Sequence, residues 1–371
     1  MKIENVKAYP VKIPLKNLEN GGIVPYETSH EIVNDALSLL IQIKTDEDIE
    51  GWGEINLVLK PSTMKKIIED DIGESVMDED PTNIRKIVEK SAFDVSGQYF
   101  SAPALISGIE VACWDIKGKH LGESVSNLLG GSLKESVDIS YCLGITDPEF
   151  AAEKAKKIME DGYNTLKTKG GNDIISDADR IKKIREEVGP DLNIRIDQNQ
   201  ALNAAETVRF LQKVEDYNLQ YVEQPIRITS FGDLASLRNR TKTPIAVNED
   251  CYIKANAFLA VKKDSIDAAV VDYEPLGGLL KLEEFGGMAE QANLPLAHHC
   301  GFDMGIKTAA IVHGTSTIPG FVYAMDSTYY AHKDDIIKER LSIEEGCYKV
   351  PSKPGLGIEV DMTKIREYMI E

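Results

Sequence analysis

The sequence lacks long apolar stretches and paired cysteines. No run of 18 apolar residues occurs in its 371 residues, and the first segment, MKIENVKAYP, contains no signal-like apolar run. We therefore expect a cytoplasmic protein without a membrane-spanning helix. The five cysteines lie far apart and form no CxxC pair, which predicts reduced thiols and excludes a disulfide framework.

Positive charge is also scarce. Lysine and arginine number 42 against 61 acidic residues, a formal net charge of −19. Such a chain would repel a phosphate backbone, so nucleic acid is excluded as a partner. A small anionic substrate remains compatible with this charge, because lysines and a metal ion would set the field at its site.

The pattern of the chain changes near residue 126. Before it, alternating segments at 3–13, 36–45 and 49–55 predict antiparallel strands, and residues 62–122 predict helices. After it, short apolar runs alternate with amphipathic helical stretches to about residue 330. We expect an α/β protein with an N-terminal α+β capping domain (1–125), a (β/α)8 TIM-type barrel (126–330) and a C-terminal segment (331–371) that returns to the cap.

Residues 17–31 separate the first two predicted strands. The stretch NLENGGIVPYETSHE is polar and contains a Gly–Gly pair and a proline, which is typical of a surface loop. Alternatively, it forms a flap over the barrel mouth and brings Tyr26 and His30 to the substrate. The polar flap would also offer Asn17, Asn20, Glu27 and Thr28.

Polar residues end the predicted barrel strands one after another. Consecutive positions are 23 to 28 residues apart: Lys169, Asp197, Glu223, Glu249, Asp272, His299 and Asp326. One strand, one helix and two loops account for this spacing. Because the strand ends of such a barrel meet in one mouth, we expect these side chains to form one active site.

Three of these residues are acids on consecutive strands. Asp197, Glu223 and Glu249 would repel one another unless a cation lay between them. Oxygen ligands favour a hard ion, first Mg²⁺ and second Mn²⁺. Asn199 shares the face of Asp197 and is expected to support the ion or the substrate.

Lys167 and Lys169 lie two residues apart on one predicted strand and face the same way. Each ammonium makes charging the other more costly, which predicts lysine pKa values lowered toward those of a usable base. Two solvated surface lysines are the alternative.

Asp272 and His299 lie across the mouth from the lysines. A carboxylate that holds the Nδ1–H of an imidazole fixes its tautomer for acid–base work. His298 has the opposite parity and is expected to face away. A base on each side of a metal-bound ligand implies removal of the proton α to a carboxylate through an enediolate. Asp326 is expected to hydrogen-bond a substrate carboxylate oxygen.

The chain resembles the enolase superfamily over nearly its whole length. The motifs are SGIEVACWDIKGK (107–119), KTK (167–169), RIDQN (195–199), YVEQP (221–225), AVNED (246–250), VDYEPLGG (271–278), AHH (297–299) and PGLG (354–357). The resemblance implies that Lys169 is one base and that Lys167 contacts the substrate carboxylate. It further implies that Asp197, Glu223 and Glu249 hold Mg²⁺ and that the Asp272–His299 dyad serves the other face.

The resemblance is to the mandelate-racemase-like branch. The predicted sixth strand, 268–272, has no lysine, and Asn248 stands where the muconate-lactonizing branch has an aspartate. Asp326 replaces the glutamate of mandelate racemase and is similar to the glucarate-dehydratase arrangement. This favours dehydration of a polyhydroxy (sugar) acid. A racemase or epimerase of an α-hydroxy acid is the alternative, followed by a muconate-type cycloisomerase and a non-enzymatic metal-dependent binding protein. We also expect a homo-oligomer.

Overall fold

The computed structural model describes residues 1–92, 102–253 and 255–371. Its N-terminal part contains an antiparallel sheet in the order β1–β4–β5, with bounds Ile3–Pro14, Asp35–Thr45 and Glu50–Asn56. These strands match the three predicted alternating segments. Between β1 and β4 lie the short helix η1 (Leu18–Asn20) and the paired strands β2 (Tyr26–Glu27) and β3 (Ile32–Val33).

Helices pack on this sheet where the sequence predicts them, apart from residues 93–101, which lie outside the described residues. They are α1 (Pro61–Lys66), the π-helix η2 (Ile67–Gly73), α2 (Glu74–Val76), α3 (Ile84–Ser91), α4 (Pro103–Leu121) and α5 (Val125–Leu128). The long helix α4 is buried on nearly all sides. It approaches β5 so closely that a Cβ on Gly53 would lie 1.9 Å from the carbonyl oxygen of Gly108. Only glycine permits this contact.

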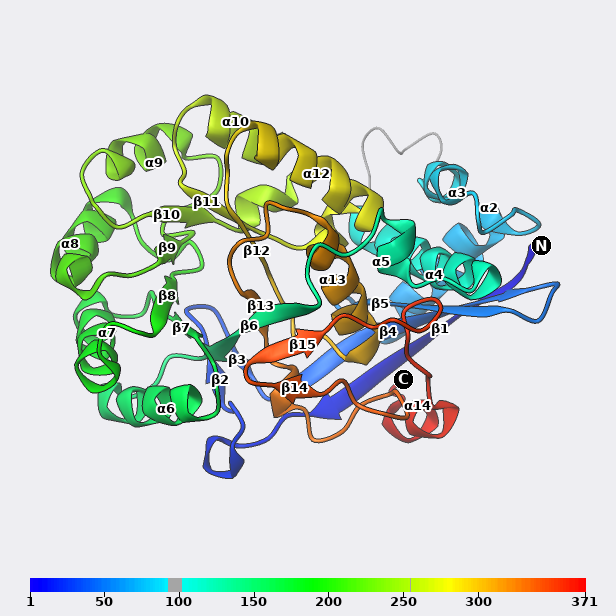
Figure 1. Cartoon of the computed structure of the whole chain (residues 1–371), viewed down its shortest axis with the longest axis horizontal. Coiled ribbons are helices and arrows are strands. Elements are labelled where there is room, and N and C mark those ends of the chain that lie inside the picture. Colours follow the sequence, from blue (N-terminus) through cyan, green and yellow to red (C-terminus); the bar gives the residue numbers. More distant parts are fainter. Residues whose placement is uncertain (93–101, 254) are drawn as a thin grey trace.

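Eight parallel strands form the barrel on the left of Figure 1. They are β6 (Ser136–Leu143), β7 (Thr165–Lys169), β8 (Asn193–Asp197), β9 (Tyr221–Glu223), β10 (Ile245–Val247), β11 (Ala268–Val271), β12 (Leu296–His298) and β13 (Met325–Ser327). Pairing runs from β6 to β12 in sequence order, and β13 pairs with β6. The Tyr323 N–H donates to the Leu296 carbonyl across the remaining gap between β12 and β13.

Helices surround the strands and cover the outer face of the barrel wall (Figure 1), while side chains from the strands fill the inside. The main ones are α6 (Pro148–Glu160), α7 (Ile174–Val188), α8 (Ala204–Val214), α9 (Phe231–Arg238), α10 (Asn256–Lys262), α12 (Leu279–Gln291) and α13 (Gly305–Thr317). Shorter helices follow α8 and strands β10, β11 and β13: η3 (Glu215–Tyr217), η4 (Glu249–Tyr252), α11 (Tyr273–Leu276) and η5 (Tyr329–Ala331).

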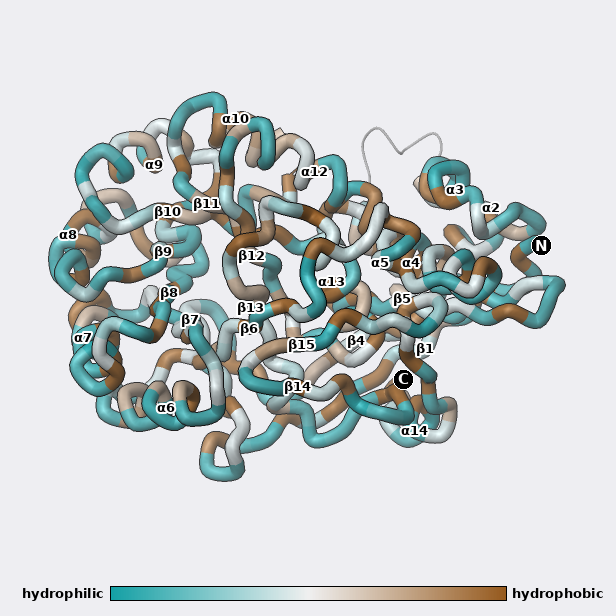
Figure 2. The backbone as a smooth tube through the Cα atoms, viewed as in Figure 1, coloured by the Kyte–Doolittle hydropathy of each residue, from teal (hydrophilic) through white to brown (hydrophobic). Residues whose placement is uncertain are grey.

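This packing explains why a short strand such as β11 (AAVV) consists of apolar residues alone. Every residue of β7 and β11 is buried, as expected for parallel strands packed on both faces. Hydrophilic segments lie on the loop tips and outward turns around the barrel (Figure 2). Within the described ranges, no helix is long and apolar enough to cross a membrane.

The segment after η5 is more regular than the sequence suggests. It contains β14 (Ile343–Glu344), β15 (Cys347–Lys349) and α14 (Met362–Tyr368). Strand β15 pairs antiparallel with β6, which extends the barrel sheet. Beyond α14, the Ile370 N–H donates to the carbonyl of Pro10, so the chain end contacts β1.

Candidate active site

A cavity of about 430 Å³ lies at the carboxyl ends of the barrel strands. Predicted site residues line it from five strand ends and from the segment 17–31: Tyr26, His30, Lys167, Lys169, Asn199, Glu249, His299 and Asp326. The volume falls within the range of about 300–1,000 Å³ that is usual for small-molecule sites. Lys169, Asp197 and Glu223 are the last residues of their strands, whereas Glu249, Asp272 and His299 lie one or two residues beyond theirs.

The lysines lie among carboxylates at the base of the cavity. Lys167 is 2% exposed, and its Nζ lies 2.8 Å from Glu223 Oε1, 2.8 Å from Asp326 Oδ2 and 3.2 Å from Asp197 Oδ2. Lys169 Nζ donates to Asp197 Oδ2 at 2.7 Å and to Asn199 Oδ1 at 3.0 Å. The two lysines are therefore buried members of an ion network, and the alternative of solvated surface lysines does not hold.

These contacts change the expected acid–base behaviour of the pair. Burial and the repulsion from Lys167 lower the pKa of Lys169, but the carboxylates of Asp197 and Glu223 together outweigh them, so its pKa lies above the ordinary value. The expectation of lowered lysine pKa values was wrong for this arrangement, because it considered the second ammonium without the acids. Burial, and then the charge of Asp197, raise the pKa of Glu223 well above its ordinary value.

Asp326 is held from two sides. Its Oδ2 accepts from Lys167, and its Oδ1 lies 3.4 Å from Arg195 NH1. Arg195 is fully buried inside the barrel, over the ring of Tyr221. Asp326 thus reaches the cavity with both oxygens already paired. Sequence reasoning missed Arg195, whose place in RIDQN marks only an inward-facing strand position.

Of the three acids predicted to bind metal, Glu249 is among the residues that line the cavity, whereas Asp197 and Glu223 are fully buried. Asp197 and Glu223 share the ammonium of Lys167. Among the described residues, no three His, Cys, Asp or Glu side chains converge as a ready-made metal cluster. The donor set nevertheless fits a hard divalent cation, because Glu249 Oε2 is buried without a hydrogen-bond partner in the described part of the chain. Asp197, Glu223 and Glu249 are the residues that could hold Mg²⁺.

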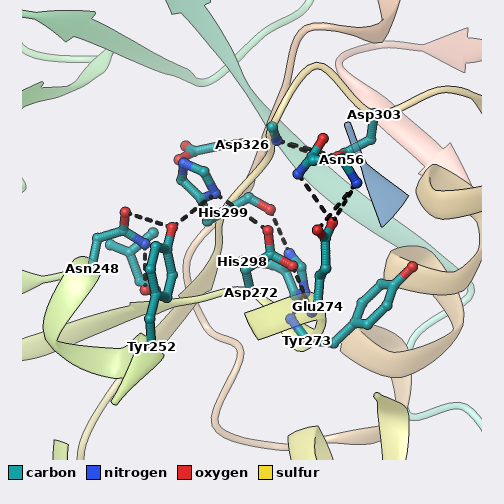
Figure 3. A network of polar contacts seen from close by, with 12 residues as sticks. Asn56, Asn248, Tyr252, Asp272, Tyr273, Glu274, His298, His299, Asp303 and Asp326 are labelled. Atoms are coloured by element: carbon teal, nitrogen blue, oxygen red, sulfur yellow. Dashed lines mark hydrogen bonds and ion pairs between the residues drawn. The ribbon is translucent and has the colours of Figure 1, made fainter. Parts of the chain in front are cut away.

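The predicted dyad forms, but its hydrogen bond is long. His299 Nδ1 lies 3.5 Å from Asp272 Oδ2, and it lies 3.3 Å from the hydroxyl of Tyr252. Figure 3 shows His299 between these two partners. His298 is fully buried and accepts from the Tyr273 N–H, so it serves the structure as expected.

Asp272 has a second, unpredicted partner. Fully buried Lys307 of α13 lies 3.2 Å from Asp272 Oδ2, 2.6 Å from Glu274 Oε2 and 2.9 Å from Asp303 Oδ1. Burial alone would raise the pKa of Asp272, but Lys307 and the hydrogen bond from His299 hold it below its ordinary value. The carboxylate of the dyad is therefore ionised and accepts hydrogen bonds only.

The N-terminal sheet reaches the same region through β5. Glu274 accepts from the backbone and side-chain amides of Asn56 (Figure 3). Glu54 Oε1 and Oε2 accept from the N–H groups of Met304 and Lys307, at the start of α13. Carboxylates thus connect β5 to the loops that carry the dyad.

The segment 17–31 covers part of the cavity. His30 Nε2 lies 2.6 Å from the Asn199 carbonyl oxygen, and Tyr26 packs edge-to-face against Phe302. Of the polar residues expected to face the substrate, Tyr26, Thr28 and His30 line the cavity. The adjacent wall, outside this segment, adds the apolar side chains of Val33, Leu37, Leu57 and Val58.

Comparisons with known proteins agree with this architecture. The chain matches the family description "Mandelate racemase / muconate lactonizing enzyme, N-terminal domain" over residues 14–130 and "Enolase C-terminal domain-like" over residues 150–364. The chain belongs to the mandelate racemase/muconate lactonizing enzyme family of the enolase superfamily. The expected TIM-type fold and family resemblance are therefore confirmed.

Family members with several isomerase activities resemble this chain. An N-succinyl-L-Arg/Lys racemase of Bacillus cereus is 27% identical over 100% of this chain and 98% of its own length. A D-galactarolactone cycloisomerase of Agrobacterium fabrum is 25% identical over 95% of this chain and 96% of its own length. The crystal structure of a dipeptide epimerase from Enterococcus faecalis, complexed with Mg and the dipeptide L-Leu-L-Tyr, superposes with a TM-score of 0.88. It is 26% identical, covering 97% of this chain and 100% of that one.

Proposed function

We propose that the protein is a Mg²⁺-dependent racemase or epimerase that inverts a carbon atom α to a carboxylate. The observation that carries the proposal is the placement of two bases, Lys169 and His299, at one cavity. Lys169 ends β7 and His299 directly follows β12; these strands are separated by two strands in one direction around the barrel and by four in the other. Two bases on opposite sides suit removal of a proton from one face and its return to the other.

The chain's own residues divide the work. Lys169 and His299 each exchange a proton with one face of the α-carbon. Lys167 and Arg195 provide the positive charge that would orient a substrate carboxylate, and Asp326, which contacts both, holds them in place. Bound by Asp197, Glu223 and Glu249, Mg²⁺ would stabilise the negative charge that develops on the carboxylate oxygens.

The cavity wall supports a substrate with an apolar part. Leu37 is 41% and Val58 is 75% exposed beside the cavity, and exposed apolar residues at a site commonly contact ligands. The named substrates of the racemase and epimerase relatives are acylated amino acids and dipeptides. We therefore propose an N-acylated amino acid or a dipeptide as the first substrate class to test.

Hydrogen exchange in D₂O tests the proposal directly. With Mg²⁺ and separate enantiomers of each candidate, the wild-type protein should incorporate deuterium at the α-carbon of both. Lys169→Ala should retain exchange of one enantiomer only, and His299→Asn of the opposite one. Loss of all exchange in both variants, with Mg²⁺ still bound, would contradict a two-base mechanism.

Dehydration of a sugar acid is the second candidate. It is favoured by the polar groups of the cavity wall: Thr28, His30, Glu31, Asp35 and Asn56. In this reaction His299 would help the β-hydroxide to leave after Lys169 removes the α-proton. Formation of a keto acid from a sugar acid in the same panel would identify the dehydratase, and racemised starting material would exclude it.

A further inference from the structure

His299 Nδ1 has two neighbours that can receive its hydrogen. Asp272 Oδ2 lies at 3.5 Å, at the outer limit of a hydrogen bond, and the Tyr252 oxygen lies at 3.3 Å. Asp272 cannot serve His299 alone, because its Oδ2 also contacts Lys307 and its Oδ1 accepts from the Glu274 N–H. The direction of the Tyr252 contact therefore matters for the tautomer of His299.

Asn248 determines that direction. Its Nδ2 donates to the carbonyl oxygen of Val270 at 2.9 Å. A carbonyl can only accept, so the amide cannot be rotated by 180° at this position. The Asn248 Oδ1 consequently faces the Tyr252 hydroxyl, 3.0 Å away.

The direction in which the Tyr252 hydroxyl donates its hydrogen is then fixed. Asn248 Oδ1 accepts only, so the phenol donates its single hydrogen to it and turns an oxygen lone pair toward His299. Burial, and then the charge of Asp272, raise the pKa of Tyr252 well above its ordinary value, so the phenol keeps its proton. Asn248 is 2% exposed, which limits exchange of these partners for water.

We propose that Asn248 and Tyr252 are positioning residues that, with Asp272, hold neutral His299 as the Nδ1–H tautomer and leave Nε2 free as the base. This series of hydrogen bonds starts at the Val270 carbonyl. Figure 3 shows its continuation from Asn248 through Tyr252 to the imidazole. Asn248 adjoins Glu249, so the same loop places a predicted metal ligand and the tautomer-setting contact. The catalytic part of this inference rests on the proposed two-base function, whereas the tautomer itself does not.

Nitrogen-15 NMR of histidine-labelled protein reads the tautomer without any turnover. The chain has six histidines, and the resonance lost in His299→Asn assigns the site. The wild-type protein should show His299 as Nδ1–H. A neutral His299 protonated at Nε2 would overturn the inference while leaving the two-base function untouched.

A pair of variants tests the direction of the hydrogen bonds from Tyr252. Asn248→Leu removes the acceptor, so the freed Tyr252 hydroxyl can donate to His299 Nδ1. The Nε2–H tautomer should then appear, and exchange from the His299 face should fall about tenfold or more. Adding Tyr252→Phe removes that competing hydrogen and should restore both the Nδ1–H signal and exchange. A residue that serves only folding would not be rescued by a second deletion.

Controls separate this effect from general damage. Exchange from the Lys169 face should remain within about twofold in these variants, because that base lies across the cavity. Tyr323→Phe, at a position two residues before β13, should change neither tautomer nor exchange. The inference is overturned if Asn248→Leu keeps the pure Nδ1–H form, or if the double variant recovers neither readout.

Discussion

Replacing Lys307 with methionine removes an ammonium that three carboxylates share while keeping most of the side-chain volume. Lys307 is fully buried and lies within 3.2 Å of Asp272, Asp303 and Glu274. Removing one partner of a buried ion pair costs about 3–5 kcal/mol, because the remaining charge is left uncompensated. We expect Lys307→Met to lower the free energy of unfolding by about that amount, a large share of the roughly 5–15 kcal/mol of a typical protein.

The loss of unfolding free energy caused by Lys307→Met should become smaller as the pH falls. Burial, opposed by Lys307, raises the pKa of Glu274 to about 7. Between the ordinary carboxyl pKa of about 4.3 and this value, the folded protein holds a proton that the unfolded chain has released, so lower pH stabilises the folded state. Without the ammonium, the pKa of Glu274 should rise further. The increase in the free energy of unfolding from about pH 8 to about pH 6 should therefore be larger in Lys307→Met than in the wild type.

Urea unfolding followed by circular dichroism at both pH values measures the two effects. Lys281→Met is the matched control, because it removes an exposed pair with Glu284 that is worth about 0–1 kcal/mol. If Lys307→Met and the control lose the same small free energy at both pH values, the carboxylates do not depend on Lys307, and the reasoning is refuted.

Chelation with EDTA should abolish turnover and Mg²⁺ should restore it, and Glu223→Gln should weaken Mg²⁺ binding in calorimetry; full activity of metal-free protein would remove the ion from the mechanism. Deletion of residues 20–28 should change kcat/KM across the substrate panel more than Mg²⁺ affinity, because this segment covers the cavity. An unchanged preference would make 17–31 a plain surface loop. Burial lowers the pKa of His313 to about 4, so the unfolded chain binds the extra proton first as the pH falls. Stability should therefore drop by about 3 kcal/mol between about pH 7 and pH 4, and urea titrations of His313→Gln should lack this part of the slope.

The barrel was predictable because its signal is local and repeated. Each short apolar run marks a strand buried on both faces, and even spacing places the polar strand ends at one mouth. This even spacing alone was enough to predict that Lys169, Asp197 and Glu223 lie at strand ends. The limits of short strands were less certain, since Glu249 and His299 lie beyond the ends of β10 and β12.

The partners of those residues could not be read in the same way. Lys307 lies in GIKTAAIVHG, a mainly apolar helical stretch, and its acids come from two different loops. The contact between Asn56 and Glu274 joins residues 218 positions apart, which no periodic pattern encodes. The lysine pKa values were mispredicted for the same reason, because the sequence shows the neighbouring lysine but not the acids that surround it.

The reciprocal contacts between β5 and the barrel limit how this protein can be recombined with its relatives. The acid of Glu54 completes the first turn of α13, while Glu274 completes the backbone hydrogen bonding of Asn56. A chimera joined between α5 and β6 would inherit one half of each contact from each parent. Parents that differ at position 54 or 274 would leave buried amides without acceptors beside the loops that carry Asp272 and His299. Exchange of N-terminal parts between relatives therefore requires a glutamate at position 54 of the donated part and a glutamate at position 274 of the barrel.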